Sequence, residues 1–279
     1  MEILRPPRRS FSTARPARHP LRLLPLAACA LLAPCAAGAA TSSPEALAIV
    51  DRMIAAHGGM EAWASAPSVS FEDEFRGATE EAGQPSRITV EQGRRRAYLD
   101  FPGTDMRMAW DGEQAWSLSW ELPYPPRFLA LLNYYFLNLP WLARDPGVVL
   151  GAPQRARLQQ DPTEYIAIRM TFEADTGDTP DDYYLLYIDP ESHRLRGCEY
   201  IVTYSTLLPE GADQTPPHDL LFEDWATVDG LLVPTRYTIY EKDGAVYARC
   251  DVRDWSFRRP FEAARVAMPP GAVVDTSTP

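Results

Sequence analysis

The sequence is poor in the residues and motifs that usually carry catalysis. It holds four histidines and four cysteines in 279 residues. It has no glycine-rich nucleotide-binding loop, no H-E-x-x-H or C-x-x-C pair and no G-x-S-x-G elbow. The signatures of nucleotide-dependent enzymes, zinc proteases and serine hydrolases are therefore missing. We expect no metal ion, no cofactor and no catalytic role.

Positive charge is also scarce beyond the first forty residues. The chain has 27 basic and 38 acidic residues and a formal net charge of −11. Six arginines and one glutamate precede position 41, so the rest carries 21 basic and 37 acidic residues and a net charge of −16. Such a body repels nucleic acid phosphates and anionic lipid headgroups. We therefore expect no nucleic-acid partner.

The first forty residues are typical of a secretory signal peptide. Their six arginines precede an apolar segment over 23–37, which is followed by the small residues Ala37-Gly38-Ala39-Ala40. The apolar run is shorter than the roughly 20 residues that a membrane span needs. We predict a cleaved signal peptide over 1–40 and a periplasmic protein. The segment Leu26-Ala27-Ala28-Cys29 leaves a second possibility, an outer-membrane lipoprotein acylated at Cys29.

A helix is predicted directly after this segment. Ser43-Pro44-Glu45 combines an N-cap residue, a proline at the first helical position and an acidic first turn, and Gly58-Gly59 ends the pattern. His57 comes just before these glycines, where an imidazolium would meet the negative end of the helix dipole. We expect His57 to cap the helix in its charged form.

From Val69 onward the hydrophobic period is two, which indicates strands with one buried face. Asp111-Gly112 and Asp243-Gly244 are strong hairpin signals between such runs, because tight turns need positive φ angles. No alternation of strands and helices is present. The predicted fold is mainly β (α+β): a strongly curved antiparallel sheet that forms an open half-barrel in a single domain over 41–279.

One segment interrupts the strands, a helical insertion over 122–151. Its centre, Phe128 to Leu142, is apolar on nearly all faces and lies between prolines. A helix of this kind must be buried all round or must cover an apolar surface. We interpret it as a helical lid over the concave side of the sheet, although an ordinary core helix would show the same pattern. The chain after Trp255 is irregular, and we expect a loosely docked tail there.

Aromatic residues give the positive functional signal. Trp110, Trp116 and Trp120 share one parity around a hairpin and come just before the aromatic lid. An open curved sheet would leave a groove between itself and the lid, suited to an acyl chain or another elongated hydrophobic ligand. Aromatic residues that only fill a core would look the same. The predicted ligand-binding residues are Phe71, Trp110, Trp116, Trp120, Phe128, Leu131, Tyr135, Trp141 and Tyr204.

Two polar features leave an enzyme as an alternative. Asp73 has the same parity as Val69 and Phe71, which places a carboxylate on the apolar face, where burial would raise its pKa. A nearby cation such as Arg95 or Arg107 would make it structural instead. The only polar cluster is His218, Asp219, Glu223 and Asp224, whose members alternate between two faces of a strand.

Cys198 and Cys250 are the cysteines that remain after removal of the signal peptide. In a simple meander their strands lie about three strand spacings, or roughly 14 Å, apart. A disulfide needs Cα atoms within about 7 Å. We therefore predict two buried free thiols.

Several segments resemble the bacterial outer-membrane lipoprotein-sorting proteins of the LolA, LolB and LppX superfamily. They are the helix 49–60 that ends in His57-Gly58-Gly59-Met60, the turn segments 111–116 and 187–190, and 229–235. The resemblance covers most of the chain from Ser43 to Val274. It implies an incomplete, strongly curved barrel whose concave face is covered by helices, with lipid moieties bound between them.

These observations predict an exported, monomeric envelope protein that binds a lipid, an acyl chain or another hydrophobic ligand, or a lipidated protein, as a possible carrier. Two alternatives remain. One is an exported hydrolase or isomerase that uses Asp73 or the His218 cluster. The other is an envelope scaffold whose groove accepts a segment of a partner protein.

Overall fold

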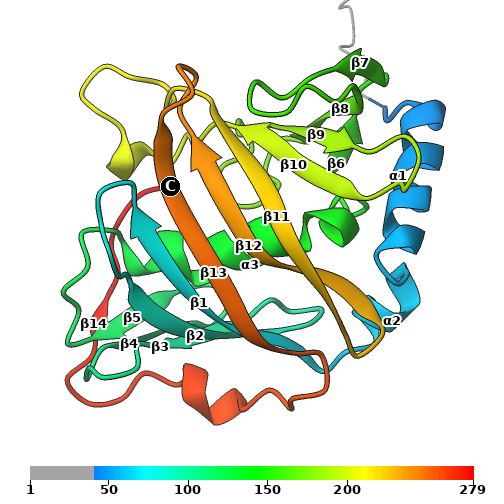
Figure 1. Ribbon diagram of the computed structural model, residues 1–279. Coiled ribbons are helices and arrows are strands. Elements are labelled where there is room, and N and C mark those ends of the chain that lie inside the picture. The colour runs from blue at the N-terminus through cyan, green and yellow to red at the C-terminus, as the bar shows by residue number, and fades with distance from the viewer. Residues whose placement is uncertain (1–40) are drawn as a thin grey trace, which may run out of the picture. The chain divides into compact units, whose positions relative to one another are not determined.

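The computed structural model describes residues 41–279 (Figure 1). The predicted signal peptide and the acylation site at Cys29 lie outside these residues. The helices are α1 (Pro44–Ala56), α2 (Met60–Ala64) and α3 (Pro126–Leu142). The strands are β1 (Ser68–Gly77), β2 (Gln84–Glu91), β3 (Ala97–Asp100), β4 (Arg107–Trp110), β5 (Ala115–Leu118), β6 (Val148–Leu150), β7 (Gln154–Ala156), β8 (Tyr165–Phe172), β9 (Tyr184–Ile188), β10 (Leu195–Tyr200), β11 (His218–Val228), β12 (Leu231–Tyr240), β13 (Val246–Ser256) and β14 (Val273–Val274).

All the strands belong to one antiparallel sheet that does not close into a barrel. Its order is β14-β5-β4-β3-β2-β1-β13-β12-β11-β10-β9-β8-β6, and β7 pairs with β8 beside β6. The two ends of the sheet, at β14 and β6, are not hydrogen-bonded to each other within the described residues. The predicted fold, an open half-barrel with a helical lid, is confirmed.

Helix α1 begins and ends where the sequence indicates. The Ser43 hydroxyl accepts a hydrogen bond from the Ala46 amide (3.4 Å), and Pro44 takes the first helical position. The helix is followed by Gly58 at φ 100°, where an added Cβ would lie 2.4 Å from the Gly230 carbonyl oxygen. Only glycine fits this close approach between the end of α1 and the turn that joins β11 to β12.

Helix α3 lies across one side of the curved sheet, behind β1, β13 and β12 in Figure 1. It contacts β2 to β5, β12 and α1, and buried residues occur all round its second half. The predicted helix over Phe128 to Leu142 is therefore confirmed. Of the helices within residues 41–279, none combines the length and the apolarity that crossing a bilayer requires.

The C-terminal tail is held in place, contrary to our expectation of a loosely docked segment. Val273 and Val274 extend the sheet by pairing with β5. Asp275 Oδ2 then accepts a hydrogen bond from the Arg127 amide (2.7 Å) in the first turn of α3. Beyond it, Ser277 contacts the Tyr204 hydroxyl at 2.8 Å. The tail thus joins one end of the sheet to the start of α3.

Both cysteines in the described chain are free thiols in the core. Cys198 lies on β10 and Cys250 on β13, three strand positions apart, as predicted. Burial raises the pKa of each thiol well above its ordinary value. They pack as small apolar side chains.

Candidate functional site

A cavity of about 480 Å³ lies beside α3, between residues from the two ends of the open sheet. Trp110 of β4 and the turn after it form one wall, and Phe172 and Tyr184 of β8 and β9 form the opposite wall. Helix α3 runs between these walls. The volume of the cavity is in the range of small-molecule sites in proteins.

Aromatic and aliphatic side chains form most of the lining. From α3, Leu131 and Tyr135 face the cavity, and the Tyr135 ring lies 5.5 Å from that of Tyr184. At the start of the helix, the Phe128 ring packs edge-on against Tyr204, with 5.2 Å between the ring centroids. An acyl chain or another apolar group placed here would move from water to an apolar surface, which is favourable.

Arg127 joins α3 to both walls of the cavity. Its Nε and Nη2 donate to the two carboxylate oxygens of Asp178 (2.7 and 2.6 Å) in the loop after β8. Its Nη1 donates to the Glu113 carbonyl oxygen (3.3 Å), and its guanidinium lies 4.2 Å from the centre of the Trp110 ring. This clasp links the β4–β5 turn to the loop between β8 and β9.

Three more charged groups of the lining are also partnered. Arg95 forms an ion pair with Asp145. Asp182 accepts hydrogen bonds from the Thr179 hydroxyl (2.7 Å) and from the amide and hydroxyl of Thr203 (2.7 and 2.8 Å). Burial raises the pKa of both Asp145 and Asp182, because a carboxylate loses hydration there.

Asp73 lies on the apolar face, as predicted, with 2% of its surface exposed. Its oxygens accept hydrogen bonds from the Ser86 hydroxyl and from the Asn133 amide of α3. Neither Arg95 nor Arg107 is its partner among the described residues. Burial raises its pKa to about 6, although both hydrogen bonds oppose the change.

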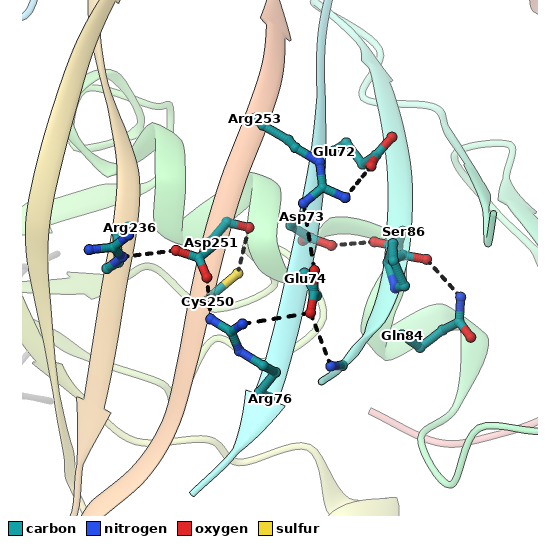
Figure 2. A network of polar contacts seen from close by, with 12 residues as sticks. Glu72, Asp73, Glu74, Arg76, Gln84, Ser86, Arg236, Cys250, Asp251 and Arg253 are labelled. Atoms are coloured by element: carbon teal, nitrogen blue, oxygen red, sulfur yellow. Dashed lines mark hydrogen bonds and ion pairs between the residues drawn. The ribbon is translucent and has the colours of Figure 1, made fainter. Parts of the chain in front are cut away.

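The neighbours of Asp73 on β1 face the other way. Figure 2 shows Asp73 turned to Ser86, whereas Glu72 pairs with Arg253 and Glu74 with Arg76 in a series of ion pairs that extends across β13. Asp73 does not line the cavity. Its contacts make it an anchor for α3, and no histidine of residues 41–279 is hydrogen-bonded to it.

The polar cluster on β11 is dispersed. His218 stacks on Tyr200 (5.7 Å between ring centroids), and its Nε2 lies 3.4 Å from Glu241 Oε2. Asp219 pairs with Lys242 (2.8 Å) instead. Glu223 accepts a hydrogen bond from Thr238, and Asp224 pairs with Arg236. Across residues 41–279 no group of three or more potential ligands is arranged to hold a metal ion.

His57 ends α1 as predicted, but not as a charged cap. It is fully buried; its Nδ1 lies 2.9 Å from the Leu232 carbonyl oxygen, and its Nε2 accepts from the Leu195 amide (3.1 Å). Burial lowers its pKa to about 4, and the charge of Arg194 adds to this effect. The imidazole is therefore neutral near pH 7 and links α1 to β10 and β12.

Comparison with known proteins identifies the fold. Neither a protein-family model nor a curated protein matches the sequence. Among solved structures, a LolA superfamily protein from Nitrosomonas europaea is 13% identical, with a TM-score of 0.50 over 80% of this chain and 97% of that one. A DUF1329 family protein from Desulfovibrio piger is 9% identical, with a TM-score of 0.51 over 81% and 98%. This chain has a LolA-like fold.

Within this LolA-like fold, the predicted ligand-binding residues fall into two groups. Five of them line the cavity, namely Trp110, Phe128, Leu131, Tyr135 and Tyr204. The other four lie elsewhere. Phe71 packs on Trp255 in the core, Trp141 stacks on Trp63 of α2, and the Trp120 indole donates to the Tyr124 carbonyl oxygen (3.0 Å).

The placement of Trp116 corrects our parity argument. Trp110 pairs with Ala115 and Ala109 with Trp116, so the two tryptophans point to opposite faces of the LolA-like sheet. Trp116 packs with Tyr98 and Val266 on the outer face, and its indole donates to the Val266 carbonyl oxygen (2.8 Å). It cannot share a ligand with Trp110.

Sequence reasoning missed one entire wall of the cavity. The alternation of Ile166, Ile168, Met170 and Phe172 predicts a strand but no contact with a cavity, and Tyr184 lies in the run Tyr183 to Ile188, whose apolar residues occupy both faces and give no alternation. The partnered charges were missed as well. The prolines before and after α3 were the one signal in the sequence that the segments at the two ends of this helix could border a cavity.

Proposed function

We propose that this protein is exported to the cell envelope and there binds a lipid, an acyl chain or another hydrophobic ligand in the cavity beside α3, as a carrier. The main support for this proposal is the apolar lining of that cavity, which lies at the open side of a LolA-like half-barrel. The basic, apolar and small-residue order of residues 1–40 supports export.

Burial of apolar surface would supply the affinity. Transfer of an apolar group from water is worth about 25 cal/mol per Å², before the costs of association are subtracted. The lining offers this contact from α3 through Leu131 and Tyr135 and from the strands through Phe172 and Tyr184, whose rings pack on that of Tyr135 (6.2 and 5.5 Å between ring centroids). A chain in the cavity would lie against this apolar surface.

Native mass spectrometry of the protein purified from its own periplasm, followed by organic extraction, tests this proposal. We expect a co-purifying lipid or acyl compound. The variant Leu131→Glu places a charge in the lining and should lose the ligand. Val273→Glu makes the same kind of change at a side chain of β14 that is 68% exposed, and it should keep the ligand.

Two results would contradict the proposal. One is an empty wild-type protein that also fails to bind any added acyl compound. The other is a folded Leu131→Glu variant, checked by circular dichroism, that retains as much ligand as Val273→Glu.

A further inference from the structure

We infer that the cavity selects a neutral amphiphile whose apolar chain carries a hydrogen-bond acceptor, such as the carbonyl oxygen of an acyl ester, and that Tyr135 and Tyr184 donate to this acceptor. The inference rests on the proposed function and names the chemical class of its ligand. Tyr184 belongs to β9 and Tyr135 to α3, so the ligand would be held from both walls.

The first observation concerns tyrosine hydroxyls. Two buried tyrosines on or under α3 have partners: Tyr134, which also lines the cavity, donates to Gln92 Oε1 (2.9 Å) and Tyr237 to Asn133 Oδ1 (2.7 Å). Tyr200, packed on Phe136, has none among the described residues. Tyr184 is only 7% exposed, yet within residues 41–279 neither its hydroxyl nor that of Tyr135 has a hydrogen-bond partner in the protein. Both residues line the cavity.

Neither hydroxyl is among the buried polar atoms without a partner within residues 41–279, so both reach the cavity. A ligand that covers such a hydroxyl must offer it an acceptor, because a buried donor without one costs free energy. In the cavity only water or a ligand atom can fill this role for Tyr135 and Tyr184. An ester carbonyl accepts hydrogen bonds while its chain fills the apolar lining. A pure hydrocarbon would displace water and leave both donors unpaired.

The second observation concerns charge. The lining contains two arginines and four acidic side chains, a formal net charge of −2. Both arginines are already committed, Arg127 to Asp178 and Arg95 to Asp145. A carboxylate or phosphate headgroup would have to break one of these pairs inside a negative site. The geometry therefore disfavours an anionic ligand.

A cationic ligand finds no free carboxylate in the buried part of the lining. Asp145 and Asp178 each hold an arginine, and Asp182 already accepts three hydrogen bonds from Thr179 and Thr203. Glu113, the lining acid whose carboxylate has neither an ion pair nor a hydrogen bond among the described residues, is exposed. A neutral ligand that accepts hydrogen bonds from the tyrosine hydroxyls leaves all of these ion pairs and hydrogen bonds in place.

A displacement assay with four compounds tests the inference. The fluorescent probe N-phenyl-1-naphthylamine is bound first, and its affinity reports the apolar cavity. It is then displaced by three C12 amphiphiles: 1-monolauroylglycerol, which is neutral, laurate, which is anionic, and dodecyltrimethylammonium, which is cationic. We expect the neutral ester to displace the probe at the lowest concentration.

Tyrosine variants then locate the donors. Tyr184→Phe and Tyr135→Phe should each weaken 1-monolauroylglycerol binding by about two- to tenfold and leave probe affinity unchanged, because only a neutral hydrogen bond is lost. Tyr183→Phe is the matched control. Tyr183 is the adjacent residue, but its hydroxyl bonds Glu199 (2.7 Å) and its ring lies under Arg169, away from the cavity.

The outcomes separate the two proposals. If the probe and all three amphiphiles fail to bind, the proposed function is wrong and the inference falls with it. If the probe binds but laurate or dodecyltrimethylammonium displaces it better than the neutral ester, the cavity is a hydrophobic site and the inference alone is overturned. Equal ester affinities for Tyr184→Phe, Tyr135→Phe and Tyr183→Phe would overturn it too.

Discussion

The amide of Asn133 on α3 donates a hydrogen bond to Asp73 on β1, and its oxygen accepts one from the Tyr237 hydroxyl on β12. One side chain thus fastens the helix to two strands, with β13 between them. The contact fixes how α3 lies on the sheet. It also requires a buried carboxylate, which has consequences for stability.

Asp73→Asn should stabilise the protein near neutral pH. A folded-state pKa of about 6 in place of 3.8 means that ionised Asp73 opposes folding at pH 7.5. This opposition amounts to about 3 kcal/mol at most. Asparagine can keep both contacts, because Ser86 can accept as well as donate. We expect urea unfolding at pH 7.5 to give a free energy about 1 to 3 kcal/mol higher for the variant.

The stabilising effect of Asp73→Asn becomes smaller in acid. Asp73 in the wild type binds its proton in the folded state first, so its contribution rises as the pH falls through 6. The gap between Asp73→Asn and wild type should narrow by about 1 kcal/mol from pH 7.5 to 5.0. Asp224→Asn, at a surface ion pair, is the control. A variant that is less stable than wild type at pH 7.5 would contradict this account.

His57→Gln should flatten the acid side of the stability profile. The pKa of buried His57 is about 4 instead of 6.5, so its contribution is complete above pH 6.5 and is lost as the pH falls toward 4. Between pH 7.5 and 5.0 this loss is about 2 kcal/mol in the wild type and absent in the variant. Urea titrations at both pH values measure it. A His57→Gln slope equal to that of wild type would refute the assignment.

Arg127→Ala should speed the release of a bound hydrophobic compound. The substitution removes the clasp to Asp178 and Glu113 and uncovers Trp110 at the cavity wall. If these contacts stabilise the ligand-bound protein by about 1 kcal/mol, their loss corresponds to a roughly fivefold faster dissociation. Stopped-flow release of N-phenyl-1-naphthylamine measures this rate. Asp178→Ala should act similarly, the double variant should add little, and Arg236→Ala on the outer face should have no effect.

Asp275→Ala should destabilise α3. The carboxylate accepts from the Arg127 amide in the first turn, where a helix has no partner of its own and where negative charge is favourable. Loss of such a contact costs about 1 kcal/mol. Thermal unfolding should therefore occur a few degrees lower than in wild type. Asp213→Ala, at an exposed loop position, should leave the midpoint unchanged.

The sequence predicted the helices and strands of this fold better than it predicted the face of the sheet on which each side chain lies. The caps at Ser43 and Gly58, the strand alternation and the proline-bounded helix all led to the observed architecture. The error at Trp116 came from carrying one parity across a hairpin. Four residues separate the paired positions Trp110 and Ala115, and an even-numbered loop always pairs odd with even positions.

The cavity itself could be predicted only in part. Aromatic content and the apolar helix led to Phe128, Leu131 and Tyr135, but which strands lie opposite depends on how far the sheet curves before it ends. That property belongs to the whole sheet. The neutral state of His57 was equally out of reach, since it depends on the backbone of β10 and β12 closing around the ring.

The cap on α3 has a consequence for the order in which the molecule is made. Arg127 and its partner Asp275 are 148 residues apart in the chain, and Asp275 belongs to the C-terminal tail. During synthesis the first turn of α3 therefore gains this partner only after Asp275 has been made. The strands β1 to β13 all precede Asp275 in the chain, so the ribosome completes them before this contact of α3 can form.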